Sequence, residues 1–343
     1  MTDDNMPKTI LVYVGLDRVG DSLLKLPFVR GLRDAYPDAH ITWLAGKDTS
    51  VYASIMASVV NGLIDEVIEH PGAVDGKMMG VGLSPKELMR RPLKGRDFDL
   101  IIDTQKVALA TLILFRIRHK VFISPFGNFL LSSKKPPKNY KFPKLMQRQL
   151  LDLLEITTGQ NFPTPVQLDL DLDPALAEIA ARVLPEGRSY IGLSPGSGGL
   201  PKCWPLEKFI ALAKLQVAAG RAPVFILGPQ EIEWQAEIAA VVPEALFPLQ
   251  QDGLGEAHNY APQLTMTLAQ RLALAASNDS ETGHMFATGG AKLISLFGRT
   301  VAEKFTPMAC NLTIIRAQDY GGREMDFIPV EAVSEAIEEV LAN

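Results

Sequence analysis

The chain has 343 residues, of which 47% are hydrophobic and 21% charged, and its formal net charge is −5. This length exceeds the usual size of one hydrophobic core and favours two α/β domains. Two cysteines are too few for a disulfide framework, the first residues lack the pattern of a secretion signal, and the longest apolar run, 107–115, is too short to span a bilayer. We therefore expect a soluble, cytoplasmic protein.

The first half of the chain alternates strand-like and helix-like segments. Strands are predicted at 9–14, 41–45, 66–68 and 98–103, and helices at 21–36, 51–57, 85–91, 107–116 and 145–156. This alternation indicates a parallel sheet with crossover helices. A segment rich in proline and aspartate, 161–174, is predicted to be a linker, so that the domains cover residues 1–170 and 171–343.

The second half repeats the alternation. Strands are predicted at 189–194, 223–227 and 292–297, and helices at 206–219, 231–241, 268–276 and 330–341. Two Rossmann-like, doubly wound domains that face each other across a cleft would hold a ligand at the carboxyl ends of their strands.

A glycine-rich loop at 194–205 separates a predicted strand from an amphipathic helix. Backbone N–H groups, the positive end of the helix and the Lys202 ammonium would converge there on a phosphate group. The loop has neither the Walker pattern nor the dinucleotide fingerprint. The alternative is an ordinary strand-to-helix turn with Pro205 at the first helical position.

Asp21 follows the first predicted strand and the turn 15–20. A doubly wound domain presents side chains to its ligand at this position, and the helix dipole would keep the carboxylate ionised. An aspartate at this position could equally be a helix cap with no catalytic role. Asp17, in the same turn, is an alternative carboxylate.

Polar residues are dense at 277–284, ahead of a further helix. Asp279 could hold ribose hydroxyls or an acceptor, Ser280 and the Gly283 amide could bind phosphate, and His284 could donate to a phosphate oxygen. The alternative is a helix cap with a structural histidine. A metal site is not expected, because His284 is one of only five histidines in the chain.

Glu231 lies in a turn of the same kind, after the predicted strand at 223–227. Its carboxylate could accept hydrogen bonds from ribose hydroxyls. It could equally be a favourable acid in a first helical turn.

A basic stretch runs from Arg116 to Arg148, with nine lysines and arginines and no acidic residue. Prolines keep 134–143 from forming a helix. The stretch is either a solvated face or a loop that meets an anionic substrate or an anionic membrane surface. A nucleic-acid partner is not expected, because the whole chain is acidic and contains no recognised binding module.

Four motifs in this order resemble those of glycosyltransferase family 9, the heptosyltransferases of lipopolysaccharide assembly. They are Gly20-Asp21 with Leu26-Pro27, Pro195-Gly196-Ser197 with Lys202, Leu227-Gly228 with Glu231, and Asn278-Asp279-Ser280 with His284 followed by Leu296-Phe297-Gly298. The resemblance covers nearly the whole chain. It implies the GT-B fold, with an acceptor-binding amino-terminal domain and a carboxy-terminal domain that binds a nucleotide sugar.

The resemblance also implies an activity: inverting, metal-independent transfer of a sugar, heptose from ADP-heptose, to the hydroxyl of an anionic lipopolysaccharide-core glycolipid. Asp21 would be the catalytic base, Ser197 and Lys202 would grip the diphosphate, and Glu231 would contact the ribose. The donor site would be completed by Asp279, Ser280, Gly283 and His284. No cofactor beyond the nucleotide sugar is implied, and the segment 134–148 would contact the inner face of the inner membrane peripherally.

One departure from the family pattern supports an alternative function. Glu281 stands where the family has a glycine that leaves room for phosphate. A carboxylate there favours a protein that binds a nucleotide sugar without transferring it. A transferase or epimerase that uses another nucleotide sugar is a second alternative, because the fold hosts several chemistries. A dehydrogenase is not expected, since the turn 15–20 lacks the dinucleotide fingerprint.

Overall fold

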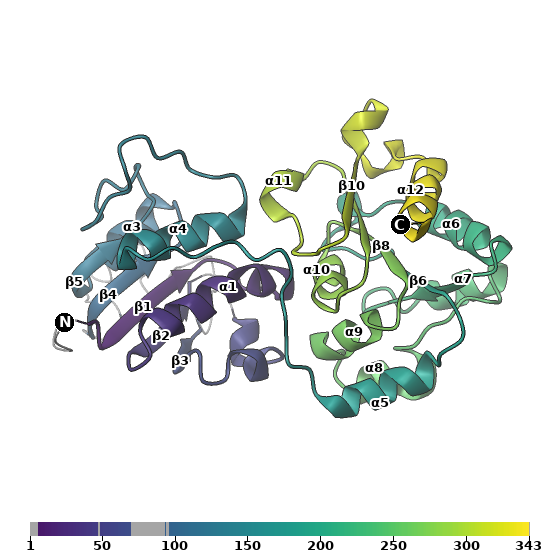
Figure 1. The fold of residues 1–343 in the computed structure, drawn as a ribbon, viewed down its shortest axis with the longest axis horizontal. Coiled ribbons are helices and arrows are strands. Elements are labelled where there is room, and N and C mark those ends of the chain that lie inside the picture. The colour runs from purple at the N-terminus through teal and green to yellow at the C-terminus, as the bar shows by residue number, and fades with distance from the viewer. Residues whose placement is uncertain (1–5, 47–48, 70–92, 94–95, 343) are drawn as a thin grey trace. The chain divides into compact units, whose positions relative to one another are not determined.

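The computed structural model describes residues 6–46, 49–69, 93 and 96–342. The chain divides into two compact units, Met1–Thr164 and Pro165–Asn343. Each unit is a parallel α/β structure (Figure 1), as the alternation of segments predicts. The boundary falls within the predicted linker, a few residues before the predicted division after residue 170.

The amino-terminal unit contains one five-stranded parallel sheet. Its strands are β1 (Thr9–Val14), β2 (His40–Ala45), β3 (Glu66–Ile68), β4 (Asp97–Asp103) and β5 (Arg118–Ile123). They lie in the order β3-β2-β1-β4-β5, the Rossmann order. The helices described are α1 (Val19–Ala35), α3 (Ala108–Phe115) and α4 (Met146–Thr158), with the 3₁₀ segments η2 (Val51–Ala53) and η3 (Ala57–Val60).

Helices cover both faces of this sheet. Helices α1 and α4 lie side by side on one face (Figure 1). Helix α3 packs on the other face, where Leu11 and Tyr13 of β1 join one apolar cluster with Ala110 and Leu114. The central strand β1 is therefore buried along its length, which explains its continuous apolar sequence.

The carboxy-terminal unit has the same plan. Its strands are β6 (Tyr190–Ser194), β7 (Ala222–Phe225), β8 (Leu274–Asn278), β9 (Leu293–Phe297) and β10 (Leu312–Arg316), in the order β10-β9-β8-β6-β7. A parallel bridge between Val224 and Leu246 places Leu246 beside β7, where a sixth strand of the sheet would lie. With that bridge the strand order is again that of a Rossmann sheet.

Helices cover both faces of the second sheet as well. The main helices are α5 (Pro174–Val183), α6 (Leu206–Ala218), α7 (Trp234–Val241), α9 (Pro262–Ala269), α10 (Glu281–Thr288) and α12 (Val330–Ala342). Shorter segments are η6 (Leu200–Lys202), η7 (Gln251–Gly253), α8 (Leu254–Ala257), α11 (Ala302–Phe305), η8 (Ala317–Tyr320) and η9 (Met325–Phe327). One core joins the sheet to α6, α7 and α12, and the other joins it to α5, α9 and α10.

Two predicted helices are wrong. The segment 268–276 is the end of α9 followed by β8, whose five residues are all buried. A strand buried on both faces has no alternating pattern, and its Leu-Ala-Ala sequence suits a helix equally well. The segment 51–57 contains η2 and the start of η3 in place of an α-helix. The helix predicted at 85–91 lies outside the described residues.

Among the strands and the longer helices, β5, β10, α5 and most of α9 are absent from the predictions. Strand β5 is part of the basic stretch, and its charges pair with the neighbouring strand. Arg118 lies 3.4 Å from Asp97, and Lys120 lies 2.8 Å from Asp99. An edge strand with charged side chains resembles a polar loop in sequence.

Candidate active site

Three loops of the carboxy-terminal unit leave the sheet at one edge. They follow β6, β7 and β8, which are adjacent parallel strands and therefore end on the same side. Between β6 and β8 the strand order reverses: later strands are added beyond β8 on one side and beyond β6 on the other. Ligands of open α/β sheets usually bind at the carboxyl ends of the strands at such a reversal. The predicted donor residues all lie in these loops or at the start of α10.

The buried amide of Asn278 holds the glycine-rich loop at both ends. Its Oδ1 accepts a hydrogen bond from the Trp204 backbone N–H at 2.9 Å, and its Nδ2 donates to the Pro195 carbonyl at 2.7 Å. The loop is therefore tied to the end of β8. In sequence Asn278 is part of a motif and has no predicted role of its own; a polar amide that ends an apolar strand is the signal for this role.

Lys202, Ser197 and Asp279 meet between the first and third loops. The Lys202 Nζ lies 3.5 Å from the Asp279 Oδ2, and the Ser197 Oγ donates to the Asp279 carbonyl at 3.2 Å. The Lys202 side chain is 50% exposed, whereas that of Asp279 is 10% exposed. Asp279 thus positions an ammonium that is still accessible to an anionic ligand.

The amino end of α10 directs backbone N–H groups toward the same edge. Ser280 is the N-cap, and its Oγ accepts from the Gly283 N–H at 3.4 Å. A Cβ on Gly283 would come within 2.7 Å of the Ser277 Oγ, so close packing on β8 requires glycine here. Glu281 is exposed in the first turn of the helix.

His284 is buried one turn into α10. Burial lowers the pKa of its imidazole to about 4, so the ring is neutral at pH 7. A neutral imidazole keeps one N–H to donate to a phosphate oxygen.

The same burial predicts a pH dependence of stability. The unfolded chain takes up a proton at His284 near pH 6.5, whereas the folded chain does so near pH 4. The stabilising effect of the neutral ring is therefore complete above about pH 6.5 and is lost as the pH falls toward 4, by about 3 kcal/mol in all. The free energy of unfolding in urea should therefore increase less from pH 4 to pH 6.5 in His284→Gln than in the native chain.

Glu231 lies in the second loop, after β7, and packs against the glycine-rich loop. Its Oε2 accepts from the Gly228 N–H at 3.1 Å, and a Cβ on Gly196 would meet its Oε1 at 2.5 Å. Burial raises the pKa of the Glu231 carboxyl. The pKa of the Cys203 thiol is also raised, first by burial and then by the charge of Glu231, which disfavours a thiolate nucleophile.

Asp21 lies in the first turn of α1 and is half-buried. The turn before it is fixed by Asp17, which is 2% exposed. The Asp17 carboxylate pairs with Lys25 Nζ at 2.8 Å, accepts from Trp43 Nε1 at 2.8 Å and accepts from the Ser50 hydroxyl. Because three donors surround it in the core, Asp17 is a structural residue, and Asp21 remains the candidate base.

The end of β4 adds a buried acid beside this turn. Asp103 accepts from Thr111 Oγ1 at 2.6 Å, Ser124 Oγ at 2.8 Å and the Gln105 N–H at 2.9 Å. Burial raises its pKa to about 6. The Gln105 side chain lies over Gly15, where an added Cβ would be 3.0 Å from its Oε1. Gln105 therefore borders the β1–α1 turn where β1 and β4 are neighbours.

The basic loop 134–148 is partly structural. Lys134 Nζ donates to the Thr157 carbonyl at 2.5 Å, and Arg148 pairs with Asp152 and Glu155 on α4. The Lys106 Nζ, three residues after β4, lies 3.1 Å from the centre of the Phe142 ring, which brings the loop to the carboxyl edge of the sheet. All five lysines of the loop are exposed: Lys134, Lys135, Lys138, Lys141 and Lys144.

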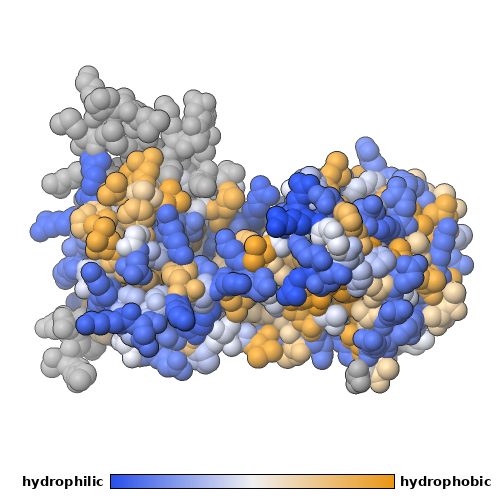
Figure 2. Space-filling model, turned by 90° about the horizontal axis from the view of Figure 1, so that it is seen from above, coloured by the Kyte–Doolittle hydropathy of each residue, from blue (hydrophilic) through white to orange (hydrophobic). Residues whose placement is uncertain are grey.

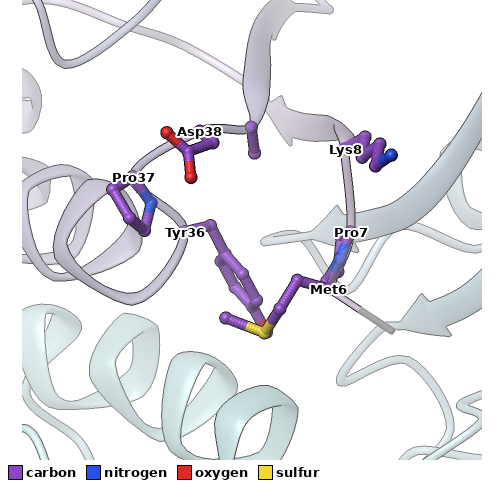
Figure 3. A pocket seen from close by; sticks show the side chains of 7 residues that line it. Met6, Pro7, Lys8, Tyr36, Pro37 and Asp38 are labelled. Carbon is purple, nitrogen blue, oxygen red and sulfur yellow. The ribbon is translucent and has the colours of Figure 1, made fainter. Parts of the chain in front are cut away.

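A cavity of about 300 Å³ lies elsewhere in the amino-terminal unit. Figure 3 shows the Met6 side chain beside the Tyr36 ring, with Lys8 and Asp38 at the borders of the cavity. It lies before β1 and after α1, at the edge of the sheet opposite to Asp21. This cavity therefore takes no part in the candidate active site.

Within the described ranges, no group of three or more His, Cys, Asp or Glu residues is placed to hold a metal ion. No helix of the described part of the chain is long and apolar enough to cross a membrane.

Comparison of the fold places both units in a known class. A glycosyltransferase of family 9 from Veillonella parvula DSM 2008 has 19% identity to this chain, with a TM-score of 0.68, over 98% of this chain and 97% of that one. E. coli ADP-heptose lipopolysaccharide heptosyltransferase II has 20% identity and a TM-score of 0.65, over 97% and 98%. E. coli heptosyltransferase WaaC, solved with ADP, has 18% identity and a TM-score of 0.63, over 97% and 99%. The protein has the two-domain, Rossmann-like GT-B fold.

The family follows from the sequence. The profile of glycosyltransferase family 9 (heptosyltransferase) matches residues 88–326, and the chain belongs to this family. No curated protein matches the chain. The resemblance drawn from four motifs is thus confirmed, and the protein is a glycosyltransferase.

Proposed function

We propose that the protein transfers heptose from ADP-heptose to a hydroxyl of an anionic lipopolysaccharide-core glycolipid, with inversion at the anomeric carbon. Family membership supports the reaction class, and similarity to the E. coli enzyme solved with ADP supports the choice of nucleotide. The observation that carries the donor site is the convergence of Lys202, Ser197 and the amino end of α10 at the ends of β6 and β8.

In this proposal Asp21 accepts the proton of the attacking acceptor hydroxyl. The hydroxyl oxygen forms a bond to the anomeric carbon while the bond from that carbon to the diphosphate oxygen breaks. Transition states at such centres resemble an oxocarbenium ion. A positioned general base contributes about 10²–10⁴ in rate.

The leaving diphosphate gains negative charge as the bond breaks. The Lys202 ammonium, the Ser197 hydroxyl and the N–H groups at the start of α10 would meet that charge, and the neutral His284 would donate one further hydrogen bond. Glu231 would accept hydrogen bonds from the ribose. Since protein groups supply the compensating charge, we propose that the reaction needs no metal.

The acceptor would bind to the amino-terminal unit. Lys135, Lys138, Lys141 and Lys144 are exposed near the carboxyl edge of its sheet and suit phosphorylated or carboxylated sugars. An anionic, lipid-linked acceptor also implies work at the cytoplasmic face of the inner membrane, with the segment 134–148 as one contact.

Incubation with ADP-heptose and a truncated lipid acceptor tests the proposed reaction. Mass spectrometry should detect an acceptor heavier by one heptose, together with released ADP. The same incubation with UDP-glucose is the control for donor choice. Release of ADP without a modified acceptor, or transfer from UDP-glucose alone, would reject the proposal.

Glu281 is the observation that favours a binder without transferase activity. The structure leaves this side chain exposed, so solvent screens its charge from a bound diphosphate. A protein that only binds would shift its melting temperature with ADP-heptose and leave the acceptor unchanged.

Replacing Lys202 with alanine should weaken ADP binding by roughly 10- to 150-fold, since a hydrogen bond to a charged group contributes about 1.5–3 kcal/mol. Turnover should also fall, because the charge on the leaving group is less stabilised. Titration calorimetry with ADP measures the first effect. Lys214→Ala, at an exposed position on α6, is the matched control and should bind ADP like the native chain. Unchanged ADP affinity in Lys202→Ala would remove Lys202 from the donor site.

A further inference from the structure

Helix α3 turns an apolar face to solvent. Leu109, Leu112 and Phe115 on the helix, with Val107 at its N-cap, are between 41% and 52% exposed. The opposite face, which includes Ala110 and Leu114, is buried against the sheet. A crossover helix in a water-soluble protein normally carries polar residues on its outer face.

This face is a cluster, in contrast to the isolated apolar residues that most surfaces carry. Every other helix in the described part of the chain has at most one large apolar side chain of comparable exposure. In Figure 2 apolar side chains gather into a group on the amino-terminal unit. Such a group usually marks a contact with another apolar surface.

The surroundings of the helix are cationic. Residues 104–151 contain no aspartate or glutamate. Lys106 precedes the helix and Arg116 follows it, and both are exposed. Arg118 and Lys120 on β5 are 80% and 81% exposed, although each also lies within 4 Å of a carboxylate on β4. An apolar helix face with cations at both ends has the composition of an interfacial helix.

We propose that the outer face of α3 docks onto a bilayer that contains anionic phospholipid. Its leucines and phenylalanine would enter the boundary between headgroups and acyl chains, while the neighbouring lysines and arginines attract lipid phosphates. Neither signal alone gives stable attachment, so the two must act together. This docking goes beyond the proposed transfer reaction. Its test does not depend on which donor sugar the protein uses.

Flotation of the full-length protein with vesicles tests the proposal. Vesicles of phosphatidylethanolamine with phosphatidylglycerol should carry the native protein, whereas phosphatidylcholine vesicles should carry about tenfold less, because they lack the anionic charge. The double variant Leu112→Gln/Phe115→Gln should lose about tenfold or more of its partitioning into anionic vesicles. Both side chains are exposed, so the variant should fold, which circular dichroism checks.

Two control variants make the result specific. Leu215→Gln/Val241→Gln removes apolar side chains of similar exposure from α6 and α7 and should float like the native chain. Arg116→Gln/Arg118→Gln removes two of the exposed cations beside the helix and should also bind anionic vesicles less. The proposal is overturned if the native protein fails to float with anionic vesicles, if the α3 variant floats normally, or if Leu215→Gln/Val241→Gln loses as much binding as the α3 variant. Loss of binding in the arginine variant together with the α3 variant supports docking through both the apolar face and its flanking charges.

Discussion

Replacing Asp21 with asparagine should lower turnover by about 10²–10⁴ while ADP binding stays unchanged. Asparagine has nearly the same shape as aspartate, but its amide cannot accept a proton at neutral pH. Asp21 belongs to the amino-terminal unit, whereas every residue proposed to hold the donor belongs to the carboxy-terminal one. The substitution should therefore affect the chemical step alone.

Single-turnover assays of heptose transfer measure this loss, and calorimetry with ADP measures donor binding. Asp34→Asn, at an exposed position on the same helix, is the matched control and should retain full activity. A variant Asp21→Asn that turns over at the native rate would reject the base assignment. A variant that loses ADP binding would show that Asp21 acts on the donor.

Replacing Asp17 with alanine should lower the free energy of unfolding by about 3–5 kcal/mol, the usual cost of leaving one member of a buried ion pair alone. The Lys25 side chain is 4% exposed, and among the described residues its Nζ would keep the Leu16 carbonyl as its acceptor. Trp43 and Ser50 would also lose their acceptor. Urea unfolding followed by tryptophan fluorescence measures the effect.

A second ion pair in the same unit gives the control. Asp97 and Arg118 are both exposed, so Asp97→Ala should cost less than about 1 kcal/mol. The double variant Asp17→Asn/Lys25→Met should be more stable than Asp17→Ala, because no buried charge is left without a partner. If Asp17→Ala were as stable as Asp97→Ala, the pair would not hold the turn before Asp21.

The sequence predicts the fold class and the positions of the site loops because both depend on local signals. An apolar run followed by glycine and a polar residue identifies the loop after β6 without knowledge of the rest of the chain. The segment of strand β8 is predicted as helix because the strand is buried on both faces. Such burial removes the alternation of apolar and polar residues that distinguishes a strand from a helix. Strand β5 is missing from the prediction because its basic residues pair with acids in β4, which lie 21 residues earlier in the sequence. The role of Asn278 depends on contacts with residues far away along the chain, which spacing does not reveal.

The amide of Asn278 has a consequence for selectivity. Because it fastens the glycine-rich loop at both ends, the conformational entropy of that loop is lost when the chain folds and not when a donor arrives. A loop with one fixed shape presents the same N–H groups to every nucleoside diphosphate, whatever sugar is attached. Discrimination among sugars must then come from side chains outside this loop, and these are the positions to vary when a different sugar is to be transferred.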